Sequence, residues 1–169
     1  MTDYLRRIEP LDAFLIPAPP SSAFPKSGKK PTAAQQRGLR YEYCVQRDLC
    51  ERFGVSYLPA PWFSYFDGYS RQRRYCQPDG ILFDLERGKV IICEIKLKHT
   101  EVAFNQISNL YFPVLQKVLG TKNWEYAACE VTRWYDYSIR VPNTYVRSSI
   151  VNSIPGQFSV YICRPRGAR

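Results

Sequence analysis

Apolar positions recur with a helical spacing between Thr32 and Gly54. Apolar side chains there fall three or four residues apart, which is the period of one face of an α-helix. Pro31 and Thr32 favour a helix start, and Gly54 favours a helix end. The inward face is predicted to carry Leu39, Glu42, Val45, Leu49 and Phe53. A buried carboxylate at Glu42 needs an ion pair or a metal, although neighbouring Tyr or Arg side chains could equally satisfy it.

A second helix is predicted from about Thr100 to Leu119, with a wide apolar face. Its apolar positions are Ala103, Phe104, Ile107, Leu110, Tyr111, Val114, Leu115 and Val118. Pro113 lies inside this pattern and lacks a backbone N–H, so we expect it to bend the helix or remove one hydrogen bond.

Strand patterns occupy much of the remaining chain. Residues 80–86 and 89–97 predict a hairpin, and "EYAACEVT" and "QFSVYICR" predict two further strands. Residues 57–66 predict an irregular edge strand because Pro59 and Pro61 cannot lie in a central one. The pattern predicts an α/β fold with a central mixed β-sheet flanked by helices.

The order of these elements predicts one domain over residues 32–169. Residues 1–31 hold six of the thirteen prolines, which favours an extended N-terminal arm. Such an arm could lie on the domain or bind a protein partner. The segment 132–156 gives no clear pattern, and we find no internal repeat.

The register of the predicted hairpin decides which polar side chains share a face. With an even-numbered loop around Arg87 and Gly88, the expected pairs are Phe83 with Ile92, Ile81 with Glu94, and Asp79 with Lys96. Side chains alternate along a strand, so Asp79, Glu94 and Lys96 fall on one face. Ile91, Cys93, Ile95 and Leu97 fall on the other. Both faces hold apolar residues, so we expect the two acids and the lysine to meet in a half-buried place.

Composition and charge indicate a globular protein with a polyanionic partner. The 169 residues are 45% apolar, and the formal net charge is +9. A basic surplus of this size favours nucleic acid, although a soluble protein can be basic without such a partner. In the predicted loop 67–77, Arg71, Arg73 and Arg74 alternate with tyrosines, which suits phosphate contact and base stacking; a solvated loop is the alternative. Lys98 could also contact a phosphate.

Six cysteines are present, and no two are spaced as C-x-x-C. This disfavours a zinc ribbon or an iron–sulfur site and suits small core residues in a reducing compartment. The first residues do not have the pattern of a secretory signal, and no apolar run is long enough to cross a membrane. We therefore expect a cytoplasmic protein.

Two carboxylates and a lysine at one point have a recognised chemical use. Asp79 and Glu94 could hold a hard cation such as Mg²⁺, which keeps several positions for water and phosphate oxygens. Such a cation polarises a phosphoryl group and lowers the pKa of bound water. Lys96 could orient that water and offset developing charge, and Glu42 could add a third carboxylate.

In these residues the sequence resembles the PD-(D/E)XK nuclease superfamily. The motif stands as Pro78-Asp79 in "QPDGILFD" and Glu94-Ile95-Lys96 in "VIICEIKL". The resemblance covers roughly residues 35 to 130. It implies a restriction-endonuclease-like core, with Mg²⁺, or Mn²⁺ in its place, held by Asp79, Glu94 and the Ile95 carbonyl, and with Lys96 positioning the attacking water.

The resemblance also extends to the two helices around the motif. It implies that Glu42 helps to hold the metal or a second ion, and that Gln106 steadies the site. The Gln106 feature resembles the RecB-like and lambda-exonuclease-like branch, in which a tyrosine follows the glutamine by four residues. Here Tyr111 follows Gln106 by five.

We therefore expect a metal-dependent nuclease, with DNA as the first substrate to test. Two other hypotheses stay open. One is a nucleic-acid-binding module on the same fold without catalysis, and the other is a phage-type protein whose arm binds another protein. Metal dependence separates the first hypothesis from the others, and salt-dependent DNA binding separates the last two.

Overall fold

We analysed a computed structural model of the chain, which describes residues 6–21, 30–98, 101–120, 123–134, 150–154 and 158–163. Side chains are described throughout these ranges except at 98, 101, 133–134, 150–154 and 158–163. The fold is mixed α/β, as the sequence predicts, with two separate sheets and helices against both faces of the larger one.

The larger sheet is mixed and has six strands among the described residues. Its order is β2 (Tyr57–Pro59), β5 (Gly80–Asp84), β6 (Lys89–Lys98), β7 (Glu125–Trp134), β9 (Phe158–Cys163) and β8 (Ile150–Ile154). The pairs β6–β7 and β7–β9 are parallel, whereas the outer pairs are antiparallel. The strand β8 lies in the segment 132–156, where no clear pattern was found.

The smaller sheet has three antiparallel strands. Its order is β1 (Pro10–Ile16), β3 (Trp62–Asp67) and β4 (Gln72–Cys76). It therefore joins a part of the predicted N-terminal arm to a part of the predicted loop.

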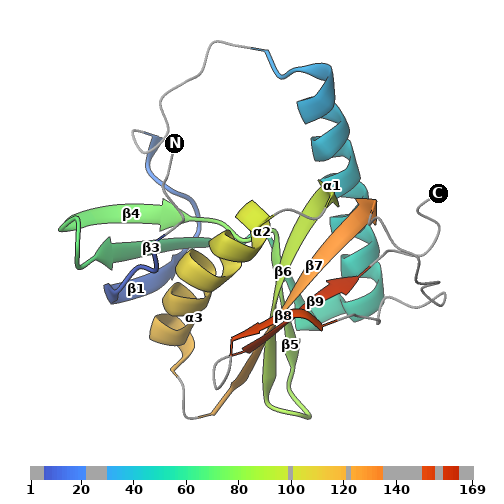
Figure 1. Ribbon diagram of the computed structural model, residues 1–169. Helices are drawn as coiled ribbons and strands as arrows, with labels where there is room; N and C mark the ends of the chain where they lie inside the picture. Colours follow the sequence, from blue (N-terminus) through green and yellow to red (C-terminus); the bar gives the residue numbers. More distant parts are fainter. Residues whose placement is uncertain are drawn as a thin grey trace.

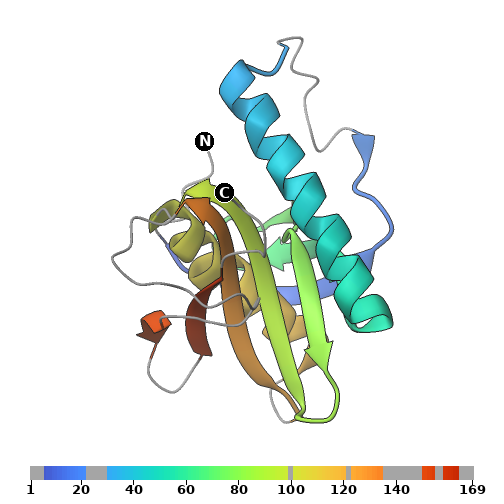
Figure 2. The ribbon, with the colours of Figure 1, turned by 90° about the vertical axis from the view of Figure 1, so that its right-hand side faces the viewer.

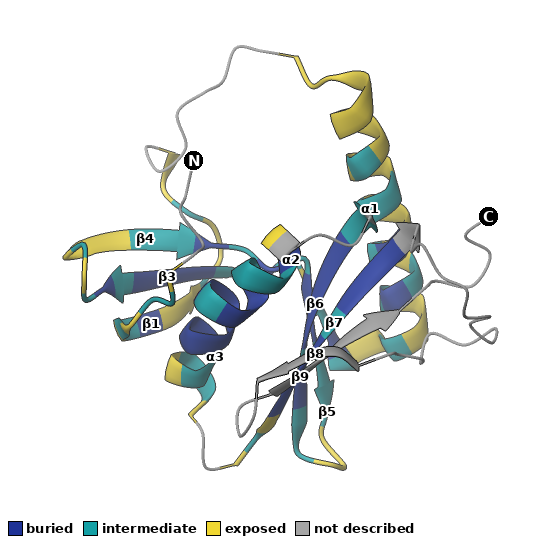
Figure 3. Cartoon of the chain, in the orientation of Figure 1, coloured by how far each residue is buried: buried dark blue, intermediate teal, exposed yellow. Residues whose placement is uncertain are grey.

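Four layers follow one another across the molecule (Figure 1): the smaller sheet, the helical segment 101–119, the larger sheet and the helix α1 (Ala33–Phe53). The turned view shows α1 lying across one face of the larger sheet (Figure 2). Apolar side chains fill both interfaces of the larger sheet, and Figure 3 shows buried residues along β6, β7 and α3. Every interior layer is thus covered on both sides.

The hairpin β5–β6 has a different register from the predicted one. Ile81 pairs with Ile92 and Phe83 with Val90, so four residues, 85–88, connect the strands instead of two. Gly88 closes this connection at φ 60°, a conformation that glycine adopts without strain. The shift is two residues, so each side chain keeps its predicted face although its partner changes.

Three other expectations are corrected. Residues 10–16 of the predicted arm form β1, whose backbone is paired with β3. Residues 72–76 of the predicted loop form β4. The predicted single strand 57–66 is two strands in two sheets, because the chain turns at Ala60, with φ 43°, and at Pro61. Residues 22–29 of the arm lie outside the described residues.

The second predicted helix is three segments: α2 (Glu101–Gln106), the π-helical segment η3 (Ile107–Tyr111) and α3 (Phe112–Leu119). Pro113 lies in the first turn of α3, where a missing N–H is tolerated. In a continuous α-helix Pro113 would leave the Asn109 carbonyl without its donor. The N–H of Ile8 donates to that carbonyl at 2.9 Å, so the backbone before β1 supplies the missing hydrogen bond.

The helix α1 begins and ends as predicted. Thr32 caps it, with reciprocal hydrogen bonds between Thr32 and Gln35, and Gly54 follows its last residue. Val45 and Leu49 are buried, but Leu39 is 57% exposed, so its prediction as an inward residue is wrong. The reason is tertiary: residues 33–40 extend past the part of the sheet that α1 covers, and nearly all of them are exposed.

Two further observations concern cysteines and long apolar segments. Cys44, Cys50, Cys76, Cys93 and Cys129 are free thiols. Of the cysteines predicted in the core from their apolar surroundings, Cys93 is buried, Cys129 is partly buried, and the Cys163 side chain lies outside the described residues. Among the described residues, no helix is both long enough and apolar enough to cross a membrane.

Gly38 lies inside α1, and an added Cβ there would meet no atom within 4 Å. Glycine inside a helix destabilises it by roughly 0.5–1 kcal/mol relative to alanine. We expect Gly38→Ala to raise the free energy of unfolding by about this amount, as measured by urea denaturation. An unchanged or lower value would contradict the open environment of this position.

Candidate functional site

The site lies where β6 continues beyond its antiparallel neighbour. The β5–β6 pairing ends at Gly80 and Cys93, whereas β6 runs on to Lys98 beside β7. At the edge that β5 leaves free, the Asp79 side chain takes the place of a strand, and its Oδ2 accepts the N–H of Ile95 at 2.6 Å. The chain therefore brings Asp79 against β6 at the carboxyl end of a parallel strand pair, where open α/β sheets commonly bind ligands.

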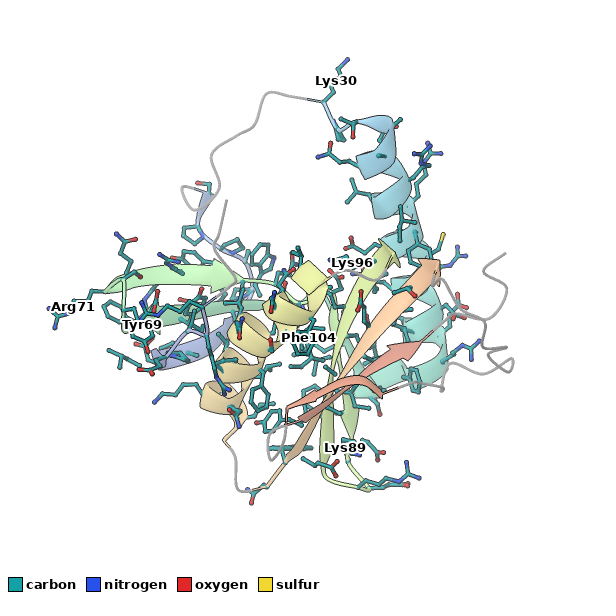
Figure 4. The ribbon with its side chains drawn as sticks, in the orientation of Figure 1. Lys30, Tyr69, Arg71, Lys89, Lys96 and Phe104 are labelled. Carbon is teal, nitrogen blue, oxygen red and sulfur yellow. The ribbon has the colours of Figure 1, made fainter. Side chains whose placement is uncertain are left out.

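Asp79, Glu94 and Lys96 meet on one face, as the sequence predicts. The Lys96 Nζ lies 2.5 Å from Glu94 Oε1 and 3.8 Å from Asp79 Oδ2. The side chain of Glu94 is 1% exposed, that of Asp79 is 16% exposed and that of Lys96 is 34% exposed. Figure 4 shows Lys96 near the end of β6, far from Lys89 at the start of the strand. The lysine thus links a buried carboxyl group to the surface.

The carboxyl groups of the site are short of positive charge. Burial, and then the charge of Asp79, raise the pKa of Glu94 to about 8 although Lys96 opposes this. Burial also raises the pKa of Asp79, again against the effect of Lys96. The pKa of Lys96 is raised as well, because its nearby carboxylates outweigh its burial. One ammonium group is therefore shared among several acids and fully compensates none of them.

One oxygen of Glu94 has no hydrogen bond within the described part of the chain to replace its lost hydration. Glu94 Oε2 is buried and has no hydrogen-bond partner among the described residues. An unpaired buried oxygen on a charged group is costly, and such atoms are rare in native proteins. This oxygen lies beside the ion pair to Lys96, so it marks a position where a cation or a donor would be stabilising.

Glu42 approaches the same site from α1. Its pKa is raised, by burial first and then by the charge of Asp79. The neighbouring Gln46 donates from Nε2 to the Asp79 carbonyl at 3.1 Å and lies 3.5 Å from Glu42 Oε1. Gln46 therefore connects the two acids. Sequence reasoning missed it, although it follows Glu42 by one helical turn.

The backbone of Asp79 is held from several elements at once. Its carbonyl accepts hydrogen bonds from Gln46 Nε2, from Tyr57 Oη at 3.2 Å and from the Ala60 N–H at 3.1 Å. The Gln77 side chain donates to the Ala60 carbonyl at 2.8 Å. These contacts fix the turn before β5, and with it the direction of the Asp79 carboxyl group.

Gln106 reaches the site through Tyr111. Gln106 Nε2 donates to Tyr111 Oη, which donates in turn to the Gln77 carbonyl at 3.0 Å. The two residues are five apart, and the π-helical turn η3, in which the Phe112 N–H donates to the Ile107 carbonyl, brings them together. In the described contacts Gln106 supports the turn before Asp79 and does not touch the acids or the lysine.

The strand β7 adds two polar side chains that sequence reasoning missed. Glu130 pairs with Glu94 and Thr132 with Lys96 in the parallel register, so all four share a face. Glu130 and Thr132 are fully buried, and Thr132 Oγ1 has no hydrogen-bond partner in the described part of the chain. The signal was present in "YAACEVT", where an acid interrupts an apolar strand.

The predicted phosphate-binding arginines lie elsewhere. Arg73 binds Asp12 at 2.8 Å and Ser64 Oγ at 3.0 Å, and Arg74 lies 3.8 Å from Asp67. Arg71 is exposed at the tip of the β3–β4 hairpin, well apart from Lys96 in Figure 4. The structure therefore groups the three arginines on the smaller sheet and does not bring them to the acids. The Lys98 side chain lies outside the described residues.

The residues present suit a magnesium-type cation bound by few protein ligands. Among the described residues, no three His, Cys, Asp or Glu side chains converge closely enough to hold a metal alone. Mg²⁺ often binds one or two carboxylates and completes its shell with water and phosphate oxygens. Asp79 and Glu94 provide two, with one buried oxygen unpaired. The Ile95 carbonyl points to the same edge as its N–H, toward Asp79.

Comparison with known proteins gives no match: no family model, no curated protein and no solved structure matches this chain.

The close approach at Gly80 yields a prediction about the Asp79 turn. A Cβ at Gly80 would overlap the phenol ring of Tyr57, whose hydroxyl binds the Asp79 carbonyl. We expect Gly80→Ala to lower the free energy of unfolding by about 1–3 kcal/mol, because the ring must move within a packed core. Urea denaturation measures the change.

Gly38→Ala is the matched control for this substitution. The same added methyl group should be stabilising at Gly38, in open space, and destabilising at Gly80. Equal effects at both positions would contradict the tight contact between Gly80 and Tyr57.

Proposed function

We propose that this chain is a metal-dependent nuclease that hydrolyses phosphodiester bonds, with DNA as its first expected substrate. The observation that carries the proposal is the charge imbalance of the site. Asp79 and the buried Glu94 share one lysine, and one oxygen of Glu94 stays unpaired among the described residues. Burying Glu94 as a carboxylate is unfavourable unless a ligand compensates its charge. A proton does so up to about pH 8, and a divalent cation would take the place of that proton.

Asp79, Glu94 and the Ile95 carbonyl would hold Mg²⁺, for which Mn²⁺ can substitute. Glu42 would support this site from α1, either directly or through water. When bound, the cation would polarise the scissile phosphoryl group and lower the pKa of a coordinated water. Gln46 and Tyr57 keep Asp79 in place through its carbonyl, so the carboxyl group needs little rearrangement to act as a ligand.

Lys96 is placed where its ammonium group could orient the attacking water and stabilise negative charge on the phosphate. Its side chain is one-third exposed, and its ammonium group contacts both acids. From there Nζ can orient an incoming water by hydrogen bonding and offset negative charge that builds on the phosphate oxygens. The resemblance to PD-(D/E)XK nucleases supports the same role for the lysine, and it supports a restriction-endonuclease-like core.

A nucleic-acid substrate is supported by charge. The net charge of +9 favours polyanions, and phosphate contacts from Lys and Arg dominate such binding. Arg71 is exposed, whereas Arg73 and Arg74 already contact carboxylates. Of the three arginines, we propose Arg71 as the strongest candidate for a phosphate contact, together with Lys98.

The first test is a cleavage assay with supercoiled plasmid, linear duplex and single-stranded DNA, each with Mg²⁺, Mn²⁺ or EDTA. We expect cleavage that needs the cation and falls at least about 100-fold in Lys96→Ala and in Asp79→Asn, since positioned acid–base groups contribute roughly 10²–10⁴-fold. The preferred substrate would also distinguish an endonuclease from an exonuclease.

Lys89→Ala is the control for the charge change. Lys89 lies at the other end of β6 and pairs with Glu125 at 2.9 Å, away from the acids. It should keep full activity. A folded wild type that binds DNA but cleaves no substrate with either metal would overturn the nuclease proposal and favour a non-catalytic binding module.

The raised pKa of Glu94 predicts how stability depends on pH without divalent cations. The folded protein keeps this proton up to about pH 8, whereas the unfolded chain releases it near 4.5. The free energy of unfolding should therefore fall as pH rises from about 4.5 to about 8. The glutamine side chain in Glu94→Gln is neutral at every pH, so the free energy of unfolding of this variant should fall less over the same pH range. Mg²⁺ should raise the thermal midpoint of the wild type, and more at pH 8 than at pH 5.5.

Glu125→Gln provides the comparison variant in the same thermal unfolding series. Glu125 lies on β7 with an exposed side chain. It should retain the wild-type pH profile and the response to Mg²⁺. If Glu94→Gln also retained both, Glu94 would be neither the titrating group nor a cation ligand.

A further inference from the structure

A groove runs from the outer end of α1 to Glu42 and Lys96. It has a volume of about 730 Å³ and lies between the N-terminal half of α1 and the end of β6. Its lining comprises Lys30, Pro31, Thr32, Gln35, Gly38, Leu39, Glu42, Ile95, Lys96 and Leu97. Figure 4 shows Lys30 at the outer end and Lys96 at the inner end. The groove therefore leads from the surface to the lysine of the proposed reaction.

Gly38 keeps this groove open. It lies inside a helix, where glycine is unfavourable, and packing does not require it, because an added Cβ would meet no atom within 4 Å. Because glycine has no side chain, the part of the groove next to residue 38 stays empty. Beside it Leu39 is 57% exposed, so an apolar side chain faces the same space without a described partner covering it.

The charges around the groove suit a polyanion. Lys30 and Lys96 line it at its two ends, and the acid among its lining residues is Glu42, next to the site itself. Arg37 and Arg40 are exposed on the other side of α1, so they add positive charge near the groove without lining it. The lining thus combines a lysine at each end with the apolar side chains of Pro31, Leu39 and Leu97, which suits the phosphates and the apolar parts of a nucleotide chain.

We infer that this groove binds a single strand of nucleic acid and leads it to Lys96, with Gly38 providing the space. A volume of about 730 Å³ lies within the roughly 300–1,000 Å³ of pockets that hold drug-sized molecules, so it accommodates a short stretch of one strand and not a duplex. This inference rests on the proposed function in one respect: the nuclease proposal is the reason why the strand would lead to Lys96.

The test measures binding without cleavage, in EDTA, by fluorescence anisotropy of a labelled dT12 and of a duplex of the same length. Wild type should bind dT12 more tightly than the duplex. Gly38→Leu fills the groove with a good helix former and should weaken dT12 binding at least tenfold. Gly38→Ala adds only a methyl group and should weaken dT12 binding less than Gly38→Leu does. Lys30→Ala should reduce the salt slope by about 0.7, as expected for one phosphate contact to a single strand.

Cys44→Leu is the control for an added apolar side chain. Cys44 is exposed on α1 and does not line the groove. Thermal unfolding should show Gly38→Leu and Cys44→Leu both folded. Unchanged dT12 binding in folded Gly38→Leu would overturn the inference, and so would equal binding of dT12 and duplex. It would also be overturned if an acidic peptide bound in the groove and dT12 did not.

The two proposals fail separately. If Gly38→Leu binds dT12 like wild type while Lys96→Ala abolishes cleavage, the groove inference is wrong and the nuclease proposal stands. If Gly38→Leu loses dT12 binding while wild type cleaves no substrate with either metal, the groove stands as a single-strand binding site and the nuclease proposal is wrong.

Discussion

The hydrogen bond from the Ile95 N–H to Asp79 Oδ2 joins the fold to the site. It exists because β5 stops at Gly80 while β6 continues, which leaves backbone groups on a free edge. The Asp79 side chain accepts a backbone hydrogen bond from this edge that a neighbouring strand would otherwise accept. Because a side chain replaces a strand here, a carboxyl group lies against β6 and the preceding segment turns toward α1. The end of β6 stays free of a neighbouring strand on this side, and the groove lies there. The contacts to the Asp79 carbonyl from Gln46, Tyr57 and Ala60 all reinforce that placement.

The same edge explains why the polar groups are poorly compensated. The helical segment 101–119 and α1 cover the two faces of the larger sheet, so the Glu94 carboxyl group on β6 loses water, and its Oε2 has no hydrogen-bond partner among the described residues. Lys96 is the positive side chain in contact with Asp79 and Glu94, and it serves both. A fold built only for stability would replace such a cluster with apolar residues at little loss. Its presence in the core is what the proposed function would require, since a bound cation would compensate these acids.

The helical segment 101–119 shows how the tertiary structure accommodates two local irregularities. Pro113 cannot donate to the Asn109 carbonyl, and Ile8 from another layer does so. Gln106 and Tyr111 are five residues apart, one more than the spacing that brings side chains together on an α-helix. The π-helical turn accommodates this spacing, so the two side chains still meet. In both cases a departure from regular helix geometry connects that helix to its neighbours: to the chain before β1 in the first case and to the Asp79 turn in the second.

The sequence by itself determined the periods of the elements, and therefore which side chains share a face. Asp79, Glu94 and Lys96 meet because alternation along a strand survives a register shift of two residues. The ends of α1 also followed from local signals at Thr32 and Gly54. Partners across space needed the tertiary structure: Glu130 and Thr132 join the site only through the parallel pairing of β6 with β7. Likewise Leu39 has the period of a buried residue but is exposed, because α1 extends beyond the sheet. Periodicity is a property of the local backbone, whereas strand order and helix overhang depend on contacts between distant segments, which no local pattern encodes.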